Sequence, residues 1–138
     1  MRVPESKRQG PTIVVVDDEI RMCSLVESIL ADAGYNPVVT SDPRVALELV
    51  RRENAALLLV DISMPHMDGY AVMDALRGDP VTSACPVIFM TGHLAFTERV
   101  QAFRRGARDY VAKPFTAEKL LAKIARVLDD GQTRSPAS

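Results

Sequence analysis

Short runs of consecutive apolar residues alternate with longer stretches of helical periodicity along the chain. We interpret five of these runs as buried strands: Ile13–Val16, Val38–Thr40, Leu57–Val60, Val87–Met90 and Tyr110–Ala112. Solid apolar runs of this length are typical of parallel strands covered on both faces. Between them, apolar residues recur every three or four positions, as in amphipathic helices, within residues 22–30, 45–50, 72–76, 96–103 and 120–128. The alternation predicts an α/β fold, a doubly wound (βα)5 sandwich of three layers around a five-stranded parallel sheet.

Capping and turn residues fall where these helices should begin and end. Asp42 precedes Pro43, so a capping carboxylate stands before a proline at the first helical position. Gly34 follows the first helical stretch, and Thr116 precedes the last one. We therefore expect the folded domain to cover residues 12–128, with flexible segments at residues 1–11 and 129–138.

Composition narrows the class of protein. The chain has 138 residues, 47% of them hydrophobic, and a formal net charge of −1, which is typical of a single globular domain without a basic nucleic-acid-binding surface. It has no apolar run long enough for a membrane span, and its first eleven residues lack the apolar stretch of a signal peptide. Cys23 and Cys85 have no Cys-x-x-Cys spacing, so we expect buried, reduced thiols in a cytoplasmic protein.

Chemically reactive side chains follow four of the five predicted strands. Asp17 and Asp18 follow the first strand, Asp61 the third, Thr91 the fourth and Lys113 the fifth. Ligands of open parallel sheets bind beyond the carboxyl ends of the strands. Crowded carboxylates need a cation, and all-oxygen ligands suit Mg²⁺, or Mn²⁺ in its place. Each aspartate could instead cap the helix after it, but the coincidence at several strand ends favours a metal-assisted phosphoryl site.

Several motifs in this order resemble the receiver domain of two-component response regulators, including chemotaxis receivers. They are Asp-Asp-Glu after the first strand, D-I-S-M-P-H-M-D-G from Asp61 to Gly69, Thr91, and G-A-R-D-Y-V-A-K-P-F from Gly106 to Phe115. The resemblance covers residues 12–128 and implies a flavodoxin-like sandwich. It also implies that the chain is not an enzyme but a signalling domain that assists its own phosphorylation and dephosphorylation.

The resemblance assigns a role to each residue of the acidic site. Asp61 would accept a phosphoryl group from a sensor histidine kinase or a histidine phosphotransfer protein. Asp18 and Asp61 would bind Mg²⁺ directly, Asp17 through water, and Ser63 through its backbone carbonyl. Lys113 would offset the charge of a phosphoryl oxygen, ahead of a Lys-Pro bond that is commonly cis in this family.

Two further residues resemble the switch of that family. Thr91 would donate its hydroxyl to the phosphoryl group, and Tyr110 would swing inward behind it. The surface formed by the fourth helix, fifth strand and fifth helix would then change and control a partner protein. Ser63 and His93 lie where side chains could tune the lifetime of the phosphoryl group.

The charged residues beside this surface have two interpretations. Arg99, Arg104, Arg105 and Arg108 form either an ordinary solvated face or a contact patch for an acidic partner. Asp109 and Lys123 fall where regulators with winged-helix outputs place an ion pair across a dimer. The expected state is accordingly a monomer or a weak, phosphorylation-dependent dimer.

Three other functions fit these residues less well. A haloacid-dehalogenase-type aspartyl-phosphate phosphatase would carry an acid two residues after its nucleophile on the first strand, whereas Ser63 follows Asp61 on the third. A flavodoxin-like cofactor carrier would have a phosphate loop where Asp17 and Asp18 stand, and a degenerate scaffold receiver would lack site residues.

We expect a freestanding receiver that acts on a downstream protein without direct nucleic-acid or membrane contact. The alternative is a receiver cut from a larger DNA-binding regulator or hybrid kinase, since no effector domain fits after Leu128.

Overall fold

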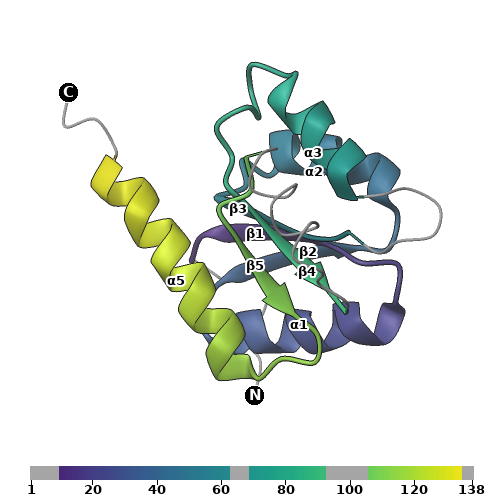
Figure 1. Ribbon diagram of the computed structural model, residues 1–138, viewed down its shortest axis with the longest axis vertical. Coiled ribbons are helices and arrows are strands. Elements are labelled where there is room, and N and C mark those ends of the chain that lie inside the picture. The colour runs from purple at the N-terminus through teal and green to yellow at the C-terminus, as the bar shows by residue number, and fades with distance from the viewer. Residues whose placement is uncertain (1–9, 63–68, 93–105, 135–138) are drawn as a thin grey trace.

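The sheet has the parallel architecture that the apolar runs predict. The computed structural model describes residues 10–62, 69–92 and 106–134. The five strands are β1 (Thr12–Val16), β2 (Asn36–Thr40), β3 (Leu57–Asp61), β4 (Val87–Thr91) and β5 (Asp109–Ala112). They lie side by side in the order β2-β1-β3-β4-β5, and every neighbouring pair is parallel (Figure 1). The chain therefore moves outward from β1 to β2 and then returns to β3, which makes β1 and β3 the point where the winding reverses.

Helices connect the strands and cover both faces of the sheet. They are α1 (Ile20–Asp32), a short 3-10 helix η2 (Pro43–Val45), α2 (Ala46–Arg52), α3 (Gly69–Arg77) and α5 (Ala117–Arg134). Helices α1 and α5 lie on one face and α2 and α3 on the other (Figure 1). The helix expected within residues 96–103 lies outside the described residues. Within the described residues, no helix is both long and apolar enough to cross a membrane.

The backbone confirms the helix boundaries predicted at Gly34, Asp42 and Thr116. The Asp42 carboxylate accepts a hydrogen bond from the Arg44 amide at 2.9 Å, directly before η2. The Thr116 hydroxyl accepts one from the Lys119 amide at 3.1 Å and so caps α5. Gly34 follows the end of α1 with φ of +94°, a left-handed conformation that favours glycine. Helix α5 continues to Arg134, beyond the domain end expected at residue 128.

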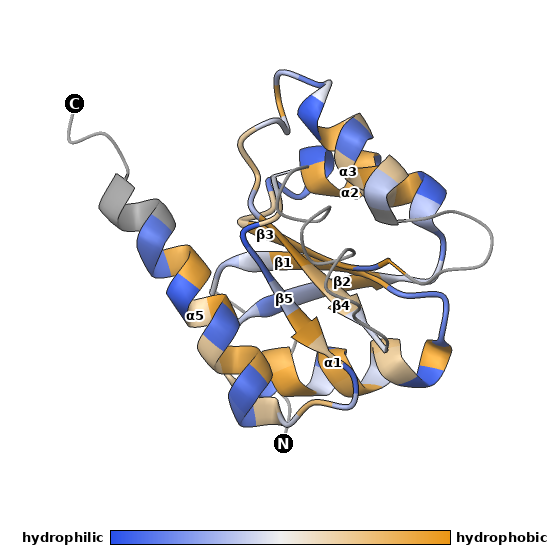
Figure 2. Cartoon of the chain, viewed as in Figure 1, coloured by the Kyte–Doolittle hydropathy of each residue, from blue (hydrophilic) through white to orange (hydrophobic). Residues whose placement is uncertain are grey.

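Alternation along the strands sorts the core into two apolar clusters. Side chains such as Val14, Leu58 and Phe89 pack with α2 and α3, whereas Ile13, Leu59 and Met90 pack with α1 and α5. Strands β1, β3 and β4 are orange along most of their length, and the helices have orange inner faces and blue outer faces (Figure 2). The sheet thus separates two independently packed halves of one domain.

Arg77 joins three segments at the end of the sheet opposite the strand carboxyl termini. From α3 its guanidinium group donates to the carbonyls of Ser83 at 2.8 Å, Cys85 at 2.9 Å and Gly106 at 3.4 Å. Gly106 has φ of +100° and no side chain, so the turn before β5 passes close to Arg77 and Met73. Arg77 therefore fixes the start of β4 and the turn before β5 against α3.

We expect Arg77→Met to lower the free energy of unfolding by about 1–2 kcal/mol, because the part-buried carbonyl of Cys85 and the exposed carbonyls of Ser83 and Gly106 lose a charged donor. Urea titration followed by circular dichroism measures the change. Arg44→Met is the matched control, because the Arg44 side chain is 82% exposed and its ion pair with Asp42 lies on the surface. Equal stability of the two variants would contradict the role assigned to Arg77.

Candidate functional site

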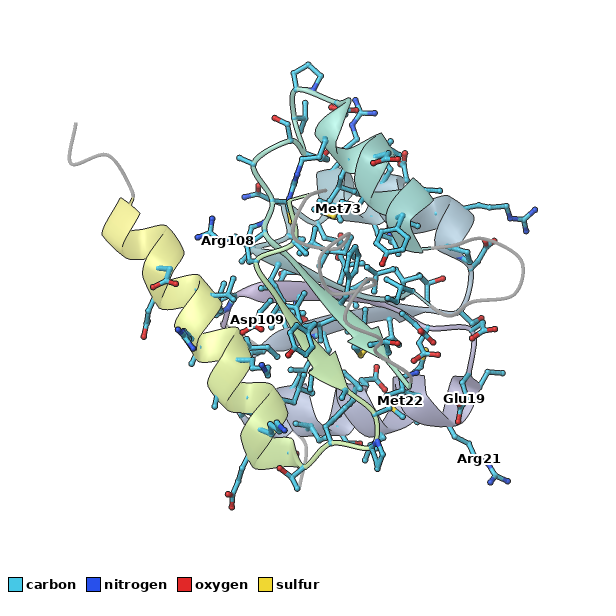
Figure 3. All side chains as sticks on the ribbon, in the orientation of Figure 1. Glu19, Arg21, Met22, Met73, Arg108 and Asp109 are labelled. Atoms are coloured by element: carbon cyan, nitrogen blue, oxygen red, sulfur yellow. The ribbon has the colours of Figure 1, made fainter. Side chains whose placement is uncertain are left out.

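The carboxylates lie at the point where the winding of the sheet reverses. Asp17 directly follows β1 and Asp61 ends β3, and the register pairs Val16 with Val60. Asp17 is fully buried and Asp61 is 4% exposed, whereas Asp18 is exposed at the rim. Local structure orients Asp17, because its carboxylate accepts a hydrogen bond at 2.9 Å from the amide of Glu19. Glu19 lies directly before α1 (Figure 3). The structure thus brings together the acidic residues that the strand ends predict.

Lys113, which directly follows β5, contacts both Asp17 and Asp61. Its ammonium group lies 2.7 Å from Asp17 Oδ2 and 3.0 Å from Asp61 Oδ2. The Lys113 amide donates to the Thr91 carbonyl at 2.7 Å, which fixes the backbone directly after β5. The Lys113–Pro114 bond is cis, as expected. One cation therefore bridges the carboxylates that follow β1 and end β3.

Burial and charge act against each other in this cluster. Burial raises the pKa of the Asp17 carboxyl, although the hydrogen bond from Lys113 opposes the rise. Burial lowers the pKa of Lys113, but the hydrogen bonds and negative charges of Asp17 and Asp61 outweigh it, so the pKa is raised overall. Lys113 accordingly stays protonated, and the site keeps an excess of carboxylate over ammonium groups.

The carboxylates are arranged so that one metal ion could contact all of them. Asp17, Asp18 and Asp61 each offer an oxygen, and these three oxygens lie within 4.8 Å of one another. Lys113 contributes one positive charge beside these three carboxylates. A divalent ion with a preference for oxygen, such as Mg²⁺, fits both the donor atoms and the remaining charge.

Thr91 and Tyr110 lie on adjacent strands and on one face of the sheet. Thr91 ends β4 and is 1% exposed, while Tyr110 lies on β5 opposite Phe89 and is half-buried. Side chains two residues apart on a strand share a face, so Thr91, Phe89 and Tyr110 all belong to the α2 and α3 side. The predicted switch residues are therefore close enough in the sheet to respond to one another.

The remaining predicted site residues have different outcomes. Ser63 and His93 lie outside the described residues, as do Arg99, Arg104 and Arg105. Asp109 and Lys123 form an ion pair within the chain at 3.1 Å, and their expected role across a dimer stays a prediction.

Cys23 is a neighbour of the site that the sequence did not reveal. Its thiol donates to the Asp17 carbonyl at 3.0 Å, and the residue is 7% exposed. The position in the first turn of α1, facing the end of β1, was the available signal, but a buried cysteine on an apolar helix face is equally typical of plain packing. Both cysteines are free and buried, as expected.

We expect both thiols to resist alkylation in the folded protein. Burial raises the pKa of Cys85 to about 11 and raises the pKa of Cys23. At pH 8 the Cys85 thiol is therefore ionised in about one molecule in a thousand, and the thiolate is the reactive form. Intact-mass analysis after iodoacetamide treatment should show slow labelling in buffer and rapid labelling of both cysteines in urea. Rapid labelling of Cys85 in the folded protein would contradict its burial.

The geometry agrees with comparisons to known proteins. Residues 13–125 match the response regulator receiver domain family. The chain belongs to this family. As a receiver domain it is a module of two-component signal transduction, a family in which phosphorylation and Mg²⁺ binding are typical.

Curated relatives and solved structures support the same assignment. The receiver is 35% identical over 120 residues to a probable transcriptional regulator, ycf27, of Porphyridium aerugineum, covering 87% of this chain and 49% of the relative. It is 35% identical over 116 residues to the transcriptional regulatory protein ZraR of Escherichia coli, covering 84% of this chain and 26% of ZraR. The chemotaxis protein CheY4 of Vibrio cholerae superposes with a TM-score of 0.82 and 28% identity, over 86% of this chain and 99% of CheY4.

These relatives bear on the expected partners. The receiver spans half or less of the length of the two curated relatives, and both are named as transcriptional regulators. The expectation of no direct nucleic-acid contact therefore finds no support in them. The flavodoxin-like fold and the receiver assignment are confirmed.

Proposed function

We propose that this receiver accepts a phosphoryl group on Asp61, with Mg²⁺ held by Asp18, Asp61 and, through water, Asp17. The observation that carries the proposal is the position of the Lys113 ammonium group, within 3.0 Å of both Asp17 and Asp61. An ammonium group held beside the Asp61 carboxylate is also close to a phosphoryl group bound to that carboxylate, and can stabilise the negative charge on a phosphoryl oxygen. The backbone carbonyl of Ser63 completes the proposed metal ligands.

The proposed reaction is a phosphoryl transfer without proton transfer at Asp61. An Asp61 carboxylate oxygen forms a bond to phosphorus while the bond from phosphorus to the histidine nitrogen of the donor breaks, and the imidazole leaves with that electron pair. The product is an acyl phosphate on Asp61. Bound Mg²⁺ would offset the charge on the phosphoryl oxygens, and Lys113 would hold one of those oxygens.

The donor and the output follow from this chemistry. The donor is proposed to be a sensor histidine kinase or a histidine phosphotransfer protein, and the output a downstream effector protein. The length of the curated relatives also supports the second proposal, that this receiver works within a larger DNA-binding regulator. Two free, buried cysteines support the proposed cytoplasmic location. The proposed domain extends over residues 12–128, and α5 continues beyond it to Arg134. The chain is proposed to lack turnover of small phosphomonoesters.

The proposal is tested by incubating the purified protein with acetyl phosphate. We expect intact-mass analysis to show one added phosphoryl group when Mg²⁺ is present and none when EDTA removes the metal. The adduct should be lost on treatment with hydroxylamine, which cleaves acyl phosphates. A Mg²⁺-independent or hydroxylamine-resistant adduct would contradict the proposed site.

We expect Thr91→Ala to keep phosphorylation but to weaken the change at Tyr110, because the hydroxyl proposed to meet the phosphoryl group is absent. The response of a 3-fluorotyrosine label at Tyr110 to beryllofluoride, a phosphoryl mimic, measures the change by ¹⁹F NMR. Thr82→Ala is the matched control, since Thr82 is also buried (2% exposed) but donates to the Leu76 carbonyl, away from the site. An unaltered Tyr110 response in Thr91→Ala would contradict the role of the hydroxyl.

A further inference from the structure

Lys123 of α5 contacts two neighbouring residues of β5 at once. Its ammonium group lies 3.1 Å from Asp109 Oδ1 and 5.0 Å from the centre of the Tyr110 ring. Asp109 lies on the part of β5 that α5 crosses (Figure 3). The Asp109 Oδ1 atom also accepts the Tyr110 amide at 2.8 Å, so one carboxylate oxygen holds both the ammonium group and the backbone of the aromatic residue.

Each part of this cluster is partly withdrawn from solvent. The side chain of Lys123 is 24% exposed and that of Asp109 is 16% exposed. The ion pair is therefore less screened than a surface pair, and it restricts the position of a side chain that would otherwise sample many rotamers. An ammonium group held in this way over an aromatic face attracts the ring electrostatically.

The contact also depends on where the ring lies. Tyr110 is half-buried against the apolar cluster of α2 and α3, whereas Lys123 arrives from α5, which packs on the opposite face. Because Asp109 holds the ammonium group, Lys123 cannot follow the ring deeper toward Thr91. An inward movement of Tyr110 would therefore break the contact with Lys123.

We propose that Lys123 is a positioning residue for Tyr110, which favours the half-exposed ring over an inward one and thereby opposes the switch. This inference rests on the proposed function for its consequence, because Tyr110 matters as a switch only if Asp61 is phosphorylated. The free energy of a partly exposed cation–π contact corresponds to about a 2- to 5-fold change in the ratio of half-exposed to inward Tyr110 rings. Lys123 would thus set how much phosphorylation is needed for half of the response.

The test follows the Tyr110 ring in the full chain labelled with 3-fluorotyrosine. The chain has three tyrosines, so Tyr110→Phe assigns the signal. Lys123→Met removes the charge but keeps an apolar stem, and Lys123→Arg keeps the charge. Lys119→Met, at an exposed position of the same helix, is the matched control. Broadening by a soluble paramagnetic agent measures ring exposure, and a beryllofluoride titration with Mg²⁺ measures the switch.

We expect Lys123→Met to reduce the broadening of the Tyr110 signal and to lower the beryllofluoride concentration at half response by about 2- to 5-fold. Lys123→Arg and Lys119→Met should behave like the parent protein. If Lys123→Met is poorly folded in urea titration, Asp109→Asn takes its place, since it frees Lys123 while keeping an oxygen for the Tyr110 amide. Asp109→Asn should shift both readouts in the same direction.

The two readouts separate this inference from the proposed function. Unchanged broadening in Lys123→Met, or an equal change in Lys119→Met, would overturn the role of Lys123 even if the parent protein responds to beryllofluoride. A parent protein that ignores beryllofluoride would contradict the proposed function, whereas reduced broadening in Lys123→Met would still support the positioning of the ring.

Discussion

Replacement of Asp61 by asparagine is expected to abolish phosphorylation by acetyl phosphate altogether. The amide has nearly the same shape as the carboxylate, but it lacks the negative oxygen that attacks phosphorus, and it removes a charged metal ligand. Phosphoryl transfer depends on that nucleophile and on the charges placed around it, so no partial activity should remain. Intact-mass analysis of the variant, after the same incubation as the parent protein, measures the loss.

The control and the contradicting outcome are both direct. Asp32→Asn changes an exposed carboxylate at the end of α1 and should be phosphorylated like the parent protein. Asp61→Asn should remain folded, since Lys113 keeps its second partner, Asp17, at 2.7 Å. One phosphoryl group on a folded Asp61→Asn protein would show that the acceptor lies elsewhere.

Replacement of Lys113 by methionine is expected to lower the free energy of unfolding by about 3–5 kcal/mol at neutral pH, because two buried carboxylates lose their shared cation. Millimolar Mg²⁺ should restore part of this loss, since a bound divalent ion offsets the same charges. Lys119→Met, at an exposed position of α5, should change stability little. Urea titrations with Mg²⁺ and with EDTA measure these differences.

The effect of Lys113→Met should also depend on pH. Burial raises the pKa of Asp17 in the folded chain above its value in the unfolded chain, so the folded state binds a proton at Asp17 more readily. The destabilisation should therefore shrink as the pH falls through this raised pKa and should be largest well above it. A loss of stability that is equal at pH 5 and pH 8, and that Mg²⁺ does not reduce, would indicate lost packing rather than uncompensated charge.

Strand-end chemistry was predictable because it depends on topology alone. Once the apolar runs are accepted as parallel strands, Asp17, Asp61 and Lys113 must follow strands at one edge of the sheet. Which atoms meet was not predictable, since the bridge from Lys113 to both carboxylates depends on side-chain conformations and on strand order. The hydrogen bond from the Cys23 thiol to the Asp17 carbonyl was not predictable either, because it also depends on how α1 packs against the end of β1.

Asp109 and Lys123 show a second limit of reasoning from sequence. The resemblance implied an ion pair between two chains, which stays a prediction, and the structure places the two residues 3.1 Å apart within one chain. Residue type and spacing do not distinguish an internal partner from an external one. The strand boundaries were closer to expectation, although β2 begins earlier than its apolar run because Asn36 and Pro37 pair with β1 at the edge of the sheet.

The sheet separates the apolar core into two clusters, and the switch residues belong to only one of them. Thr91 and Tyr110 share their face with α2 and α3, so a rearrangement of these residues begins on that side of the sheet, whereas the apolar cluster of α1 and α5 packs on the other side. Lys123 connects the two sides, because it extends from α5 to the Tyr110 ring on the edge strand β5. Hydrogen exchange should therefore respond to phosphorylation in one half of the molecule, with α5 near Lys123 as the place where the other half registers it.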